Sequence, residues 1–229
     1  MAEALRVAIA PGEAVTALLY PAAAARRAGV ALILGHGAGA GQSSPFMVRC
    51  AADLAARGID AVTFNFPYME RGRRLPDANG GLEACYGAVI AAMRDHPTLG
   101  RLRLAIGGKS MGGRIASQVA AGGGAGALAG LVFLGYPLHP PGKPERLRAK
   151  HLPHIGAPML FVQGERDAFG TPDELRPIIA ALAPPAELYV IAGGDHSFKV
   201  RKDAGVPQEE VESAVQERIE RWLRYAAAL

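Results

Sequence analysis

The chain has 229 residues, half of them hydrophobic, and a formal net charge of +4. This length suits one well-buried α/β domain and is short for two, so we expect a single domain over residues 1–229. Its basic residues are spread through the sequence without interleaved aromatic side chains, which excludes the charge pattern of a nucleic-acid-binding surface.

Strand and helix patterns alternate along the chain. Two short strands are predicted at 5–10 and 14–20, and Pro11-Gly12 between them indicates an antiparallel hairpin. Because the later strands are almost continuously apolar, their alternation with helices predicts a mostly parallel sheet covered on both faces. These strands are predicted at 30–34, 59–64, 102–106, 131–134, 159–162 and 187–191, and the helices at 45–57, 81–94, 111–121, 172–182 and 207–228.

The expected location of the protein is the cytoplasm. The N-terminus has no basic segment ahead of an apolar core, so no signal peptide is predicted. Glycines interrupt the most apolar window, 119–136, so we expect no membrane span and no membrane partner. Cys50 and Cys85 fall at apolar helix positions, which favours buried free thiols over a disulfide or a catalytic role.

The segment 102–113 joins an apolar strand to a helix through Gly108-Lys109-Ser110-Met111-Gly112. This G-x-S-x-G pattern is typical of a nucleophile elbow, in which a strained turn presents the Ser110 hydroxyl and the Met111 N–H binds an oxyanion. The same residues also resemble the end of a phosphate-binding loop. That motif, however, requires a glycine at position 103, where Arg103 stands.

A glycine-rich loop, 35–41, follows the strand at 30–34. Its backbone donors suit the second half of an oxyanion hole, which we expect to use the N–H of Ala38, with His36 buttressing the loop. The loop also loosely matches a dinucleotide-binding fingerprint. That alternative is weaker because the next strand ends at Asn65 rather than at the acid that would hold a ribose.

Two later loops supply an acid and a histidine. Asp167 follows the strand at 159–162 and fits a carboxylate that orients an imidazole, although Glu165 and Asp173 compete for this role. His196 follows the strand at 187–191 and is the only histidine after both Ser110 and Asp167. The order serine, acid, histidine is the one that this kind of sheet requires for a catalytic triad.

Together these four loops make the chain resemble an α/β-hydrolase over nearly its full length. It is most similar to the small, nearly lidless members grouped with dienelactone hydrolases, which themselves carry cysteine where this chain has Ser110. The resemblance implies the fold, and the candidate residues predict a serine hydrolase that cleaves a small or polar ester, thioester or lactone through an acyl-enzyme, with no cofactor. Because the histidines are scattered and no pair has ligand spacing, no metal site is predicted. A catalytically silent interaction protein of the same fold is the alternative, and a nucleotide-binding protein is a weaker one.

The remaining candidates concern the substrate. We expect only a short proline-rich cap loop at 136–158, with room for one helical turn near 145–150 and none for an apolar lid. Two basic clusters, 71–74 and 143–150, are interpreted first as solvated surface charge and alternatively as attracting an anionic substrate. The sequence leaves the oligomeric state open. The candidate contacts to a small-molecule substrate are His36, Gly37, Tyr68, Arg71 and Lys109.

Overall fold

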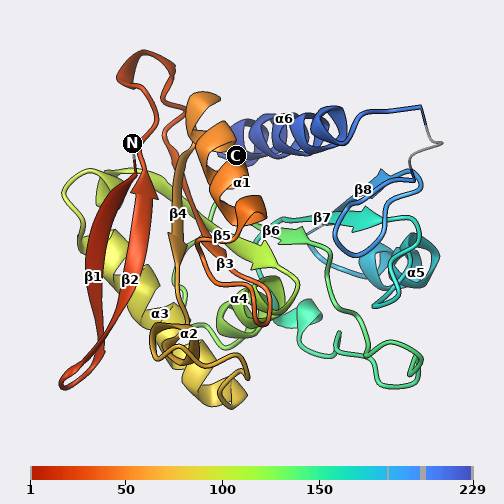
Figure 1. Cartoon of the computed structure of the whole chain (residues 1–229), viewed down its shortest axis with the longest axis horizontal. Coiled ribbons are helices and arrows are strands. Elements are labelled where there is room, and N and C mark those ends of the chain that lie inside the picture. The colour runs from red at the N-terminus through yellow and green to blue at the C-terminus, as the bar shows by residue number, and fades with distance from the viewer. Residues whose placement is uncertain (1, 185, 202–204, 228–229) are drawn as a thin grey trace.

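The computed structural model describes residues 2–184, 186–201 and 205–227. Its centre is an eight-stranded sheet with the order β1-β2-β4-β3-β5-β6-β7-β8 (Figure 1). β1 pairs antiparallel with β2, and β2 antiparallel with β4, while every later pair is parallel. The strands are β1 (Glu3–Ala10), β2 (Glu13–Tyr20), β3 (Val30–Gly35), β4 (Asp60–Phe64), β5 (Arg103–Lys109), β6 (Gly130–Leu134), β7 (Met159–Gly164) and β8 (Ala186–Ile191).

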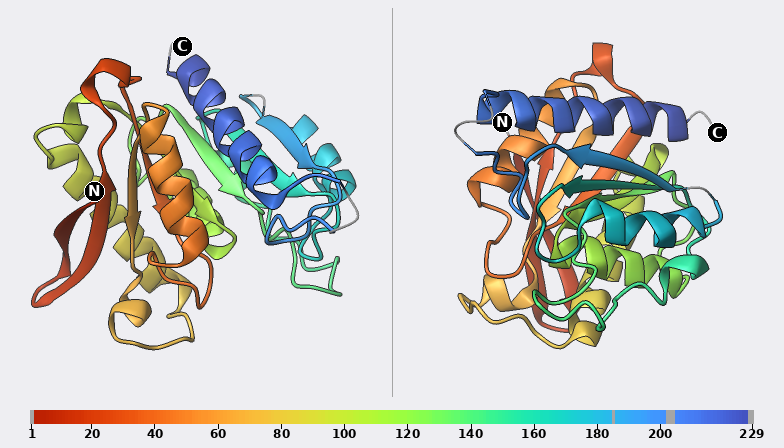
Figure 2. Two further views of the ribbon diagram at one scale, coloured as in Figure 1. Left: turned by 45° about the horizontal axis from the view of Figure 1, so that its top comes forward. Right: turned by 90° about the vertical axis from the view of Figure 1, so that its right-hand side faces the viewer.

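Helices cover both faces of this sheet (Figure 2). One face packs against α1 (Pro45–Ala56) and α6 (Gln208–Ala226), whose buried side chains form one hydrophobic cluster with the sheet. The other face packs against α3 (Asn79–Asp95), α4 (Met111–Ala121) and α5 (Pro172–Ala180), which form a second cluster. The predicted mostly parallel sheet with an N-terminal hairpin and two helical layers is therefore confirmed.

Local sequence explains the start of α5 and the buried face of α6. At the start of α5, Thr171 and Glu174 form a capping box and Pro172 occupies the first helical position. In α6, apolar side chains recur every three to four residues and are buried at Val215, Ile219, Trp222 and Ala226. The predicted end of this helix at residue 228 lies outside the described residues.

The structure differs from prediction in several short segments, among them single 3-10 turns at Ala24–Arg26 and Leu99–Arg101 that were not predicted. A single-turn helix, α2 (Pro67–Glu70), follows β4 and was not predicted, since four residues are too few to show a helical period. Between β6 and β7, the one short helical turn lies at Leu152–His154 and not near 145–150. The segment otherwise runs as turns and loop, as its prolines predict.

Both cysteines are buried and free, as predicted, and burial raises the pKa of each thiol to about 12. Among the described helices, none combines the length and the apolar character needed to cross a membrane.

Candidate active site

The turn between β5 and α4 holds Ser110 in a backbone conformation that side chains rarely adopt, with φ of 50° and ψ of −114°. Glycines on both sides allow this turn. A Cβ on Gly108 would lie 2.3 Å from the carbonyl oxygen of Gly35, and a Cβ on Gly112 would lie 2.1 Å from the same atom. Only glycine lets α4 approach β3 this closely, so the G-x-S-x-G spacing follows from packing.

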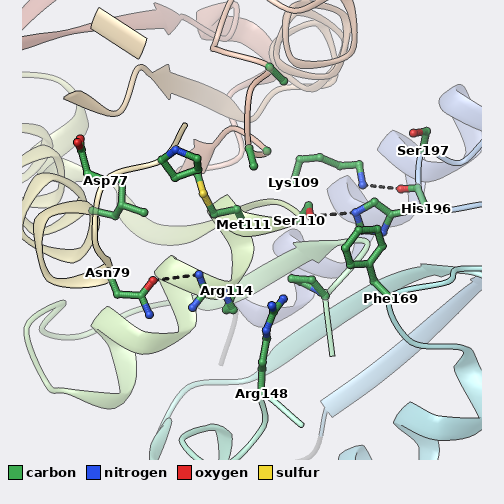
Figure 3. Close-up of a pocket in the computed structure, with 16 residues that line it drawn as sticks. Asp77, Asn79, Lys109, Ser110, Met111, Arg114, Arg148, Phe169, His196 and Ser197 are labelled. Atoms are coloured by element: carbon green, nitrogen blue, oxygen red, sulfur yellow. Dashed lines mark hydrogen bonds between the residues drawn. The ribbon is translucent and has the colours of Figure 1, made fainter. Parts of the chain in front are cut away.

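Three side chains from three different loops meet at this turn. Figure 3 shows two of them, Ser110 and His196. The Nε2 atom of His196 lies 2.9 Å from Oγ of Ser110. The Nδ1 atom of His196 lies 2.7 Å from Oδ2 and 2.9 Å from Oδ1 of Asp167. The carboxylate therefore accepts a hydrogen bond from the protonated Nδ1, which leaves the unprotonated Nε2 facing the hydroxyl.

Asp167 is buried, and its oxygens accept further hydrogen bonds that hold it in place. The backbone N–H of Phe169 donates to Oδ1 at 2.8 Å, and Nε2 of Gln163 donates to Oδ2 at 2.9 Å. The competing acid, Glu165, instead accepts a hydrogen bond from the N–H of Gly193 at 2.6 Å. Of the acids considered, Asp167 is the one that contacts the imidazole.

The loop after β3 is fixed by two buried aromatic groups. The N–H of Phe66 donates to Nε2 of His36 at 3.2 Å, so Nδ1 carries the proton and donates to the carbonyl of Gly37 at 2.8 Å. Burial lowers the pKa of His36, which favours this neutral form. The hydroxyl of Tyr68 accepts a hydrogen bond from the N–H of Gly39 at 3.2 Å. His36 and Tyr68 thus support the loop from behind rather than lining the cavity.

The loop that carries His196 is braced on two sides. The ring of Phe169 packs on the imidazole with centroids 4.2 Å apart. Nζ of Lys109 donates to the carbonyl oxygen of His196 at 2.5 Å and lies 5.0 Å above the ring of Phe198. Burial lowers the pKa of Lys109 to about 8, while Asp167 and Asp195 oppose that shift.

An open cavity of about 480 Å³ adjoins these residues. Gly37, Ala38, Lys109, Ser110 and Met111 line it, as does His196. No hydrogen bond from the N–H of Ala38 or Met111 was found within the described ranges, which leaves both donors available at the cavity wall.

The two basic clusters differ in their position relative to the cavity. Arg71 donates to Glu13 at 2.8 Å on the surface beside β2, and it does not line this cavity. Arg73 likewise pairs with Asp77 at 2.5 Å. Of the second cluster, Arg148 is the member that reaches the cavity.

Sequence reasoning missed four residues that shape the site: Gln163, Phe169, Asn79 and Arg114. Gln163 left a usable signal, because a polar side chain directly after an apolar strand marks the edge where ligands gather. The others depend on which helix face and which loop turn toward the cavity. Such orientation is not encoded locally.

Comparison with known proteins places this geometry in a family. A family model described as an alpha/beta hydrolase domain matches residues 28–224. The chain is similar to the structure of a dienelactone hydrolase from Anabaena variabilis, with 21% identity, a TM-score of 0.77, and coverage of 98% of this chain and 97% of that one. It is also similar to an α/β serine hydrolase without a lid from Xanthomonas campestris, with 18% identity, a TM-score of 0.70, and coverage of 96% and 94%. A third similar structure is Est1E from Butyrivibrio proteoclasticus, at 14% identity and a TM-score of 0.73, covering 96% and 98%.

Proposed function

We propose that this chain, which belongs to the alpha/beta hydrolase family, is a serine hydrolase that cleaves a small or polar ester-type bond through an acyl-enzyme. The observation that carries the proposal is the continuous relay from Oγ of Ser110 through both nitrogens of His196 to the buried carboxylate of Asp167. Such a relay lets a hydroxyl act as a nucleophile at neutral pH.

In the proposed reaction, Oγ of Ser110 attacks the substrate carbonyl carbon as Nε2 of His196 takes the hydroxyl proton. The carbonyl electron pair moves to oxygen, and the N–H groups of Ala38 and Met111 stabilise the resulting charge. Collapse of this intermediate breaks the bond to the leaving group, which receives the proton from His196. A water molecule then attacks the acyl-enzyme with the same proton transfers, releases the acid and restores Ser110.

The shape of the cavity supports a short or polar acyl group. It is open, about 480 Å³ in volume, and the connection between β6 and β7 contributes turns and loop rather than an apolar lid helix. A long acyl chain would leave most of its methylene groups in water, so its burial would contribute little to binding. We expect acetyl and butyryl esters to be hydrolysed more efficiently than palmitoyl esters, and efficient palmitoyl hydrolysis would contradict this part of the proposal.

The test is labelling with a fluorophosphonate probe together with hydrolysis of p-nitrophenyl butyrate. The wild type and Ser213→Ala, which changes a serine on the exposed side of α6, are expected to label and to turn over. Ser110→Ala is expected to do neither while it keeps the wild-type unfolding temperature, since the change removes one small hydroxyl. Equal turnover by Ser110→Ala would refute the assignment. Absence of both labelling and turnover in the wild type would favour a silent interaction protein.

A further inference from the structure

Two arginines face the cavity beside Ser110 from different elements. Arg114 lies on the first turn of α4, four residues after Ser110, and Arg148 lies in the connection between β6 and β7. Both line the cavity that contains Ser110 and His196, and Figure 3 shows their guanidinium groups near each other along one side of it. A substrate held by Ser110 would therefore lie within reach of both.

No carboxylate neutralises these guanidinium groups within the part of the chain that the structure describes. Arg114 donates to the side-chain oxygens of two neutral amides, Gln118 at 3.0 Å and Asn79 at 3.1 Å. No hydrogen bond from the side chain of Arg148 to a described residue was found, although its backbone is held on both sides. Its N–H donates to Leu138 at 2.7 Å, and its carbonyl accepts from the hydroxyl of Tyr136 at 2.7 Å. The loop is thus anchored, while the guanidinium has no hydrogen-bond partner among the described residues.

The surroundings leave net positive charge at this place. Asp77 also lines the cavity, but Arg73 neutralises its carboxylate. Partial burial and the neighbouring Arg148 lower the pKa of Arg114, while Tyr136 and Glu83 oppose this shift. Two half-buried like charges side by side are unfavourable unless an anion joins them.

We propose that Arg114 and Arg148 form a carboxylate subsite, so that the preferred substrate carries a carboxylate a short chain away from its scissile carbonyl. The proposal rests on the serine hydrolase function proposed above. A guanidinium offers two parallel N–H groups that match the two oxygens of a carboxylate, and a half-buried position strengthens that bond. Arg148 has this fork free, and Arg114 adds a second charge.

Paired substrates test the subsite. Mono-p-nitrophenyl glutarate and p-nitrophenyl pentanoate have acyl groups with the same number of carbons, and only the first ends in a carboxylate. We expect the wild type to prefer the glutarate ester, and Arg148→Gln to lower the ratio of the two kcat/KM values by about 10- to 100-fold, mainly through KM. Arg148→Lys should retain part of the preference, and the preference should weaken as salt is raised.

Arg146→Gln is the matched control. Arg146 lies two residues away in the same exposed loop, pairs only with Glu145 among the described residues, and does not line the cavity. This variant should leave both kcat/KM values unchanged. A ratio that is the same in Arg148→Gln, Arg146→Gln and the wild type overturns the subsite while leaving the hydrolase function intact.

Binding without turnover separates the two proposals. We expect calorimetry to show glutarate binding to Ser110→Ala and at least tenfold weaker binding to the double variant with Arg148→Gln. If this difference is found but no ester is hydrolysed by the wild type, the subsite stands and the hydrolase function fails. If glutarate does not bind to Ser110→Ala, or inorganic phosphate binds there more tightly than glutarate does, the carboxylate assignment is wrong.

Discussion

Replacing Asp167 by asparagine tests the proposed relay at its most buried member. Each carboxylate oxygen accepts a hydrogen bond from a donor other than His196: Oδ1 from the N–H of Phe169, and Oδ2 from the side-chain amide of Gln163. Whichever way the asparagine amide is turned, its NH₂ group therefore faces a donor. The variant should lose both the imidazole orientation and part of its stability.

The size of each loss follows from this geometry. An amide whose NH₂ group faces Nδ1 favours the wrong tautomer of His196, which lowers turnover by roughly three to four orders of magnitude. One buried polar group without a partner costs about 1–3 kcal/mol of unfolding free energy. For a chain of this size that corresponds to a fall in Tm of about 2–12 °C.

The assays are p-nitrophenyl butyrate hydrolysis at neutral pH and thermal unfolding followed by circular dichroism. Glu165→Gln is the matched control, because Glu165 lies two residues away and contacts the neighbouring backbone of Gly193 instead of the imidazole. Its turnover should stay far above that of Asp167→Asn. If Glu165→Gln lost turnover to the same extent, or Asp167→Asn kept wild-type turnover, the proposed role of Asp167 would be refuted.

Four further substitutions test other parts of the structure. Gly112→Ala would place a Cβ 2.1 Å from a backbone oxygen of β3, so we expect the free energy of unfolding to fall by more than about 4 kcal/mol, or the chain to fail to fold. In the control Gly87→Ala, in α3, the new Cβ meets nothing within 4 Å, so this variant should be more stable by up to about 1 kcal/mol. Urea unfolding measures both. Burial lowers the pKa of Lys109 to about 8, so its side chain loses its charge as pH rises through that value, and its charge-assisted hydrogen bond to the carbonyl of His196 weakens. We therefore expect kcat/KM to fall above about pH 8 in the wild type but not in Lys109→Met, whose activity is lower throughout; the same alkaline fall in both would exclude Lys109 as its cause. Tyr86→Phe removes a buried hydroxyl that donates to a carbonyl of β5 at 2.7 Å and accepts from an amide of the same strand at 3.1 Å. The free energy of unfolding should therefore fall by about 1–3 kcal/mol, and an unchanged urea midpoint would contradict this.

The order of elements and the positions of Ser110, Asp167 and His196 were predictable because they depend on local patterns. Apolar runs, helical periods and turn-forming glycines each operate within about ten residues. In a parallel sheet, the ends of successive strands meet at one edge, so residues just after those strands are brought near one another wherever they stand in the chain. This is why loops 57 and 29 residues apart could be assigned to one site, as the positions 110, 167 and 196 show.

Other features depended on side-chain direction, which only tertiary packing decides. Glu165 and Asp167 are equivalent in sequence, yet the turn after β7 points one toward Gly193 and the other toward His196. The arginines of the two basic clusters likewise look alike in sequence. On the surface, Glu13 forms an ion pair with Arg71. The loop before β7 is held by the hydrogen bond from Tyr136 to the carbonyl of Arg148, and Arg148 lines the cavity. The physical reason is that contacts with distant elements set the path of a loop. The sequence therefore shows which residues a loop contains, but not the direction in which their side chains point.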